Sequence, residues 1–190
     1  EYGLGTEKAE EIIKSSIKNA KIIRMDIDTT TKKGELEKII KSFQNNEYNI
    51  LLGTQMIAKG LDFEKVTLVG VINADISLNF PDFRSSETTF SLLNQVSGRS
   101  GRGERKGKVL IQTFNKDHYA IKHSKYNDYK SFYNEEIKIR KKLNYPPFCH
   151  ISLIKIISKD YKIASEMSYK IGDYLKKQIK NEIILGPSTA

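Results

Sequence analysis

Apolar residues in the first 114 positions recur with two periods, one helical and one extended. Isoleucine, leucine or phenylalanine returns every three or four residues in segments that we predict to be amphipathic helices, at 5–20, 35–46 and 85–97. Alternation that ends in Asp26 and Asp28 predicts a strand at 21–28, and short apolar runs predict strands at 48–54, 66–75 and 107–114. Because helices and strands alternate, the pattern indicates an α/β fold with a parallel sheet covered by helices.

The pattern changes after residue 114. Residues 116–143 are helical in pattern, basic and rich in tyrosine, and Pro146 and Pro147 cannot continue a helix. Further on we predict a strand at 150–158, a helix at 160–179 and a strand at 182–186. We therefore expect two domains: 1–145, with a basic helical extension from about 115, and a partial α+β domain at 146–190. Some 40 residues bury too little surface to fold well alone, so we expect the second domain to be truncated.

Composition narrows the class of protein. The 190 residues are 38% hydrophobic, with a mean hydropathy of -0.48, and no apolar run approaches the roughly 20 residues of a membrane span. The single cysteine, Cys149, excludes an internal disulfide and a cysteine-based zinc site, which fits a reducing cytoplasm. The sequence begins without methionine, so we expect it to be a fragment.

The net charge of +9 is unevenly distributed. Residues 1–114 hold 17 basic and 15 acidic residues, whereas residues 115–190 hold 15 and 8, so that the second part carries +7. Such an excess attracts phosphate backbones, although lysines that only coat solvated faces explain it equally well. Tyrosines interleave with the lysines at 119, 126, 129 and 133. They allow base stacking, but a helix that covers the core with half-buried tyrosines remains the alternative. His118 and His123 are expected to be surface or capping residues rather than metal ligands.

The stretch LLGTQMIAKGLDF at 51–63 is a first candidate site. A buried strand ends at Gly53, and Thr54 and Gln55 follow at its carboxyl end, where open α/β sheets bind ligands. Three further candidates are Lys59, Gly60 and Asp62. The glycine permits close backbone approach, and the aspartate could hold a ribose, a water or an arginine. An ordinary strand-to-helix turn, with the aspartate as a cap, explains the same pattern.

The stretch QVSGRSGR at 95–102 is a second candidate. Gln95 lies at the end of a predicted helix, and the glycines that follow break it before Arg99 and Arg102. Arginine is permanently charged and forks onto phosphate oxygens, which suits the charge that develops on a transferred phosphoryl group. A surface loop with salt bridges of little energetic weight would carry the same residues.

The order in which these stretches occur makes the functional interpretation of each more specific than either stretch does alone. GTQMIAKGLDF, VTLVGVINAD and FPDFRSSETTFSLLNQVSGRSGRG resemble, in that order, motifs V and VI of superfamily 2 helicases. DIDTTT at 26–31, FPDFRSSE at 80–87 and YPPF at 145–148 are similar to the primosomal replication-restart helicases of that superfamily. The resemblance covers essentially the whole chain, and the part from HISLIKI onward resembles the start of their C-terminal domain.

The resemblance implies a fold and a set of site residues. Residues 1–145 would be the second RecA-like lobe of the motor. Arg99 and Arg102 would be catalytic and reach the γ-phosphate of ATP, with Gln95 in support. Gly60 and Asp62 would face ATP, and Thr54, Gln55 and Lys59 would face the tracked DNA strand.

The resemblance also implies the activity of the longer protein of which this chain would be a fragment. That protein would be an ATP- and Mg²⁺-dependent 3′–5′ DNA helicase for replication restart and primosome assembly at stalled forks. Its partners would be branched or single-stranded DNA, replication-restart proteins and single-strand-binding proteins, in the cytoplasm and not at a membrane. The chain has no GxxxxGK[ST] loop, no acidic box and no cysteine cluster for the zinc module of the family. We therefore expect the chain alone to bind no zinc and hydrolyse no ATP. The alternatives are another superfamily 2 translocase, on RNA or duplex DNA, and a non-catalytic nucleic-acid-binding module.

Overall fold

The chain was analysed as a computed structural model, which describes residues 5–31, 34–58, 63, 65–98 and 107–188. It divides into two compact units, Glu1–Tyr145 and Pro146–Ala190. In the part of the chain that is described, no helix is both long and apolar enough to cross a bilayer. Candidate residues 59, 60, 62, 99 and 102 lie outside the described residues.

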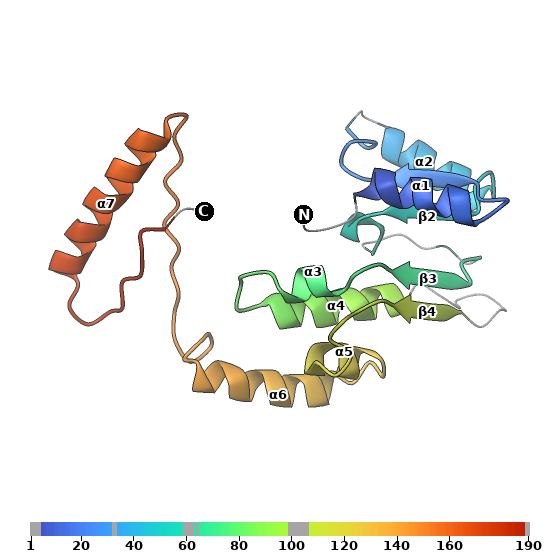
Figure 1. Cartoon of the computed structure of the whole chain (residues 1–190). Coiled ribbons are helices and arrows are strands. Elements are labelled where there is room, and N and C mark those ends of the chain that lie inside the picture. The colour runs from blue at the N-terminus through green and yellow to red at the C-terminus, as the bar shows by residue number, and fades with distance from the viewer. Residues whose placement is uncertain (1–4, 32–33, 59–62, 64, 99–106, 189–190) are drawn as a thin grey trace. The chain divides into compact units, whose positions relative to one another are not determined.

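The first unit begins with a helix and a βαβ arrangement. Its elements are α1 (Thr6–Ser16), β1 (Ile22–Met25), α2 (Glu35–Gln44) and β2 (Ile50–Gly53). β1 and β2 are parallel, with Ile22 opposite Ile50 and Met25 opposite Gly53. α1 and α2 both pack against β1 (Figure 1). The chain enters α2 through Gly34, whose φ of 87° is readily adopted only without a Cβ atom.

A second βαβ arrangement follows. It consists of β3 (Leu68–Val71), the short helix α3 (Asp75–Leu78), α4 (Ser85–Ser97) and β4 (Lys108–Ile111). β3 and β4 are also parallel, in a register that runs from Leu68 opposite Lys108 to Val71 opposite Ile111. The parallel α/β arrangement predicted from the sequence is confirmed. Its four described strands form two two-stranded sheets, because no ladder joins β2 to β3 among these residues.

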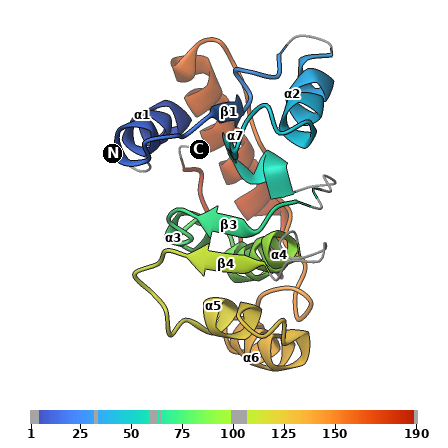
Figure 2. The same ribbon diagram turned by 90° about the vertical axis from the view of Figure 1, so that its right-hand side faces the viewer.

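The basic segment after β4 forms two helices, α5 (Tyr119–Ser124) and α6 (Tyr129–Lys142). Both carry side chains into the main core, where the rings of Phe90 and Phe132 stack at 4.1 Å and 7°. The core cluster consists of Ala74, Leu78, Phe90, Leu93, Ala120, Ile121 and Phe132. Figure 2 shows α5 and α6 below the β3–β4 layer, on the side away from β1. The extension is therefore an integral layer of the first unit.

Local polar contacts begin both of these helices. The Nδ1 atom of His118 accepts from the amide of Ala120 at 3.2 Å and caps α5, as a capping role predicted. Asp128 accepts from the amide of Ser131 at 3.0 Å and caps α6. The chain turns between the two helices at Asn127, which has a φ of 52°.

Among its described residues, 146–188, the second unit contains one helix, α7 (Tyr161–Gln178), which Asp160 caps by accepting from the amide of Lys162. The strands predicted at 150–158 and 182–186 are wrong for this structure, since neither segment belongs to a described ladder. A strand requires a neighbour that satisfies its backbone N–H and C=O groups. Their alternating apolar side chains, such as Leu153 and Ile157, consequently lie exposed.

Candidate nucleotide and nucleic-acid interface

Thr54 and Gln55 stand at the carboxyl end of β2, as predicted. Gln55 begins a single 3₁₀ turn, η1 (Gln55–Ala58), and the carbonyl of Thr54 accepts from the amide of Ile57 at 3.1 Å. A Cβ atom on Gly53 would overlap the carbonyl oxygen of Met25. The glycine therefore lets the end of β2 pack against β1, and this close approach positions the exposed Thr54 and Gln55 that follow.

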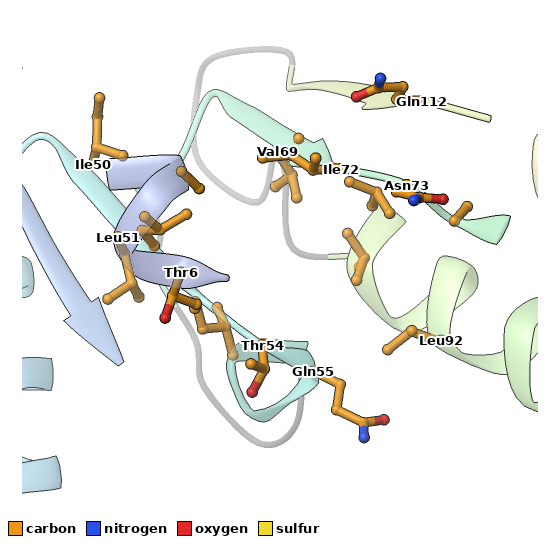
Figure 3. A pocket seen from close by; sticks show the side chains of 18 of the residues that line it. Thr6, Ile50, Leu51, Thr54, Gln55, Val69, Ile72, Asn73, Leu92 and Gln112 are labelled. Atoms are coloured by element: carbon orange, nitrogen blue, oxygen red, sulfur yellow. The ribbon is translucent and has the colours of Figure 1, made fainter. Parts of the chain in front are cut away.

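These two residues line a cavity of about 2420 Å³ within the first unit. Much of the wall is apolar and comes from α1, β2, β3 and α4, including Leu92 and Val96. Figure 3 shows Thr54 and Gln55 beside one another on the turn after β2, with Leu92 of α4 across from them. η1 lies against α4, so the first candidate stretch contacts the helix that leads into the second.

The carboxyl ends of β3 and β4 add amide side chains that sequence reasoning missed. Asn73 and Gln112 line the same cavity, and the backbone of Gln112 accepts from the amide of Ala74 at 3.0 Å. The Oδ1 atom of Asn73 is buried, and no described residue donates to it. Asn73 has a φ of 60°, a conformation that asparagine tolerates better than most residues. The asparagine directly after an apolar strand was the available signal.

Two aspartates that follow strands, Asp75 and Asp26, have structural roles. Asp75 is buried and accepts from the amide of Phe114 at 2.9 Å, from Asn115 Nδ2 at 2.7 Å and from the hydroxyl of Thr113 at 3.1 Å. Burial by itself would raise the pKa of Asp75, but these hydrogen bonds outweigh it and lower that pKa below its usual value. The carboxylate thus ties the start of α3 to the segment after β4.

Asp26, directly after β1, has an equivalent role. It accepts from the hydroxyl of Thr6 at 2.7 Å and from the amide of Thr29 at 2.9 Å, and Arg24 Nε lies 3.2 Å from it. Burial opposes ionisation, yet these contacts together lower the pKa of Asp26. Asp26 thereby holds the DIDTTT turn against α1. Among the residues described, no group of three or more His, Cys, Asp and Glu could hold a metal ion.

Gln95 occupies a different place from Thr54 and Gln55. It is exposed near the end of α4, and its Nε2 atom donates to the hydroxyl of Ser91 at 3.4 Å. It lines a groove of about 380 Å³ between α4 and α6, together with Tyr129. The structure therefore brings Gln95 onto the helix that η1 contacts, but not into the same cavity.

The FPDFRSSE stretch forms the turn before α4 and the first residues of that helix. Arg84 donates to Asp82 through Nε at 3.0 Å and Nη2 at 2.8 Å, and these bonds lower the pKa of Asp82 to about 2. The ring of Phe83 stacks on Tyr145 at 5.5 Å and lies 5.2 Å from the guanidinium carbon of Arg140. The turn is thus joined to the end of the helical extension, a connection that sequence reasoning did not find.

The parallel α/β architecture and the order of the two stretches fit the C-terminal domain of a helicase. Residues 4–104 match the model of the helicase conserved C-terminal domain, and this range is more than half of the chain. The chain belongs to that family. The matched range includes all eight candidate site residues and both candidate stretches.

Similarity to individual proteins narrows the assignment further than the family match does. The chain is 46% identical over 190 residues to replication restart protein PriA of Bacillus subtilis, covering 100% of the chain and 24% of that protein. It is 44% identical over 189 residues to PriA of Borreliella burgdorferi, covering 98% of the chain and 28% of the relative. For PriA of Synechocystis the identity is 39% over 190 residues, with 100% and 23% covered. The resemblance to replication-restart helicases is confirmed, and the chain spans about a quarter of the length of these relatives.

Proposed function

We propose that residues 1–145 are the second RecA-like lobe of an ATP-dependent 3′–5′ DNA helicase that restarts replication and assembles primosomes at stalled forks. Residues 146–190 would be the start of a further domain. The family match over 4–104 and the PriA relatives over the whole chain support this proposal. A protein with this role works in the cytoplasm, on branched or single-stranded DNA, with replication-restart and single-strand-binding proteins.

The observation that carries the proposal is the contact between η1 and α4. η1 follows Thr54, whereas α4 ends directly before the segment that contains Arg99 and Arg102. A motor lobe must couple the DNA that it grips to the nucleotide that it senses. Two neighbouring elements that carry the two candidate stretches provide a direct mechanical link for this coupling.

The candidate residues divide between the two ligands. We assign Arg99 and Arg102 to the γ-phosphate of ATP, because permanently charged guanidinium groups stabilise the charge on a transferred phosphoryl group. On the same side we place Gln95, Gly60 and Asp62. The exposed amide of Gln95 is accessible to a ligand, which fits this role. ATP supplies the energy of movement, and its Mg²⁺ would be held chiefly by a first lobe.

The remaining candidates face the DNA. Thr54 and Gln55 are exposed at the carboxyl end of a parallel strand, where ligands of open α/β sheets bind. A hydroxyl and an amide contact a sugar–phosphate backbone without reading its sequence. Lys59 would add a charge to the same contact.

The test is DNA-stimulated ATP hydrolysis by the longer protein that contains this lobe, compared between wild type and the Arg99→Ala and Arg102→Ala variants. Loss of an arginine that senses the γ-phosphate should lower turnover by about 10³-fold or more while fork-DNA binding stays intact. Arg105→Ala is the matched control, since it removes an arginine from the same segment. Unchanged turnover in both test variants would refute the site assignment.

We also propose that the chain alone hydrolyses no ATP and binds no zinc. It lacks the phosphate-binding GxxxxGK[ST] loop, and its one cysteine cannot form a cysteine cluster. Purified chain should show no ATPase activity above a buffer control with or without DNA, and no zinc by elemental analysis. DNA-stimulated hydrolysis by the chain alone would contradict the assignment to a second lobe.

A further inference from the structure

We propose that α6 and the turn before it form a second contact surface for single-stranded nucleic acid, where tyrosine rings stack on bases and lysines contact phosphates. We call it the Tyr–Lys surface, formed by Tyr126, Tyr129, Tyr133, Lys125, Lys130, Lys138 and Lys141. The proposal rests on the proposed function, because that function is the reason to expect nucleic acid as the ligand. It adds a contact that lies outside both candidate stretches.

The tyrosines of this surface are exposed although α6 packs on the core. The exposed fractions of Tyr126, Tyr129 and Tyr133 are 72%, 64% and 48%. Tyr119 differs, because its ring packs against the core and lies 5.8 Å from that of Phe132. Covering the core therefore explains Tyr119. Tyr129 contacts the core only at the ring of Phe90 and stays mostly exposed, and no ring contact with a core residue is found for Tyr126 or Tyr133 among the described residues.

Contacts between rings hold part of the surface in place. The Tyr129 ring lies 6.2 Å from that of Phe90 and 6.2 Å from that of Tyr133. The ammonium of Lys125 lies 5.3 Å from the centre of the Tyr126 ring, a cation–π arrangement. Rings that are already ordered lose little conformational entropy when a base stacks on them. An ammonium group beside an aromatic ring suits a nucleotide, because the phosphate can contact the ammonium group while the base stacks on the ring.

The charge of the surface has one sign. Positions 130, 138 and 141 lie within about 80° of one another around α6, so these lysines share one side of the helix. Of the acids nearby, Glu136 has the counter-charge of Arg140 at 2.6 Å, Glu135 contacts His123 at 2.7 Å, and Asp128 caps α6; the lysines still outnumber these acids. Lysines 122, 125, 130, 138, 141 and 142 form no ion pair with any described residue. The positive charge therefore remains available for phosphates.

The groove between α4 and α6 extends the surface. It has a volume of about 380 Å³ and aromatic walls that include Phe90, Tyr129 and Phe132, and its size is that of a small-ligand pocket. A flat, unpaired base can slide beside Tyr129 into such a groove. In a duplex the bases are stacked on each other and cannot reach these rings, so the geometry favours a single strand.

The experiment is fluorescence anisotropy of a labelled oligothymidine of about 20 nucleotides, longer than one binding site, with the full 190-residue chain and no nucleotide. Tyr126→Ala/Tyr133→Ala should weaken binding at least about fivefold, the lower limit for one lost stacking contact. The matching Tyr→Phe double variant should bind like wild type, because it keeps both rings. Tyr169→Ala, on α7 of the second unit, is the matched control for an exposed tyrosine.

A second set of variants tests the phosphate contacts. The triple variant Lys130→Gln/Lys138→Gln/Lys141→Gln should reduce the slope of log K against log salt by about 2. An unchanged affinity in the Tyr→Ala variant, an equal loss in Tyr169→Ala, or equal binding to duplex DNA would each overturn the proposal. Equally tight, tyrosine-dependent binding of polyglutamate would overturn it in favour of an acidic protein partner. None of these outcomes depends on ATP, so the ATPase test of Arg102 decides the motor assignment separately.

Discussion

Arg140 of α6 donates through Nη2 to the Oε2 atom of Glu87 on α4 at 2.7 Å, across 53 positions of sequence. The same guanidinium donates through Nε to Glu136 at 2.6 Å, and Glu136 in turn accepts from the hydroxyl of Tyr119 at 2.6 Å. The side chains of Arg140 and Glu136 are nearly buried, whereas Glu87 is half-exposed. This cluster joins the helical extension to the helix that precedes the arginine segment.

Arg140→Ala should destabilise the first unit strongly. The substitution leaves the buried carboxylate of Glu136 without its counter-charge, which typically costs about 3–5 kcal/mol. The double variant Arg140→Met/Glu136→Leu should recover most of that loss, because no buried charge is left unpaired. Lys138→Ala on the exposed side of α6 is the control and should change the free energy of unfolding by at most about 0.5 kcal/mol. Urea denaturation measures all three, and an equally small effect of Arg140→Ala would contradict the assigned role.

Tyr119 should make stability fall at alkaline pH. Burial and the hydrogen bond to Glu136 raise its pKa to about 12. The unfolded chain therefore loses this proton first, near pH 10, and the contribution of Tyr119 is full below that pH and is lost as the pH rises to about 12. Ultraviolet titration of tyrosinate should show one late phase in the wild type that Tyr119→Phe removes. A late phase that survives in Tyr119→Phe would assign it to another of the ten tyrosines.

Asp75 should make stability fall at acid pH, whereas Tyr119 makes it fall at alkaline pH. Its pKa is lowered in the folded state, so its contribution is present above the unfolded value of about 4 and is lost as the pH falls below it. Asp75→Asn should lower stability at neutral pH by about 1–3 kcal/mol and reduce the dependence of stability on pH in the acid range. The control is Asp117→Asn, an exposed aspartate nearby. Urea denaturation at several pH values is the measurement, and parallel curves for Asp75→Asn and wild type would count against this role.

Gly53→Ala should disrupt the end of β2. The added methyl group would overlap the carbonyl of Met25 and crowd Ile57, a form of overpacking that costs about 1–3 kcal/mol. Gly70→Ala in β3 is the matched control, because a Cβ atom there meets nothing within 4 Å. Thermal unfolding of the two variants should give clearly different midpoints. Equal midpoints would show that the close approach of β1 and β2 is not needed for stability.

Prediction from the sequence succeeded for elements whose pattern is local. The helix periods and the apolar runs placed α2, α4 and the four strands of the first unit, although each strand is shorter than its apolar run. The polar pair at Thr54 and Gln55 was placed correctly because it directly follows a strand. The strands predicted at 150–158 and 182–186 failed because alternation of side chains does not provide a hydrogen-bonded neighbour.

The sequence by itself determined the family, the α/β class and the two candidate stretches, since all three depend on residue types at fixed spacings along the chain. Only the tertiary structure decided that Arg140 reaches Glu87, that Asp75 accepts from the segment at 113–115, and that Tyr126, Tyr129 and Tyr133 are exposed while Tyr119 packs on the core. The physical reason is that a side chain's partners depend on which distant segments the folded backbone brings beside it. Spacing along the chain specifies the face of a helix, and packing specifies what that face contacts.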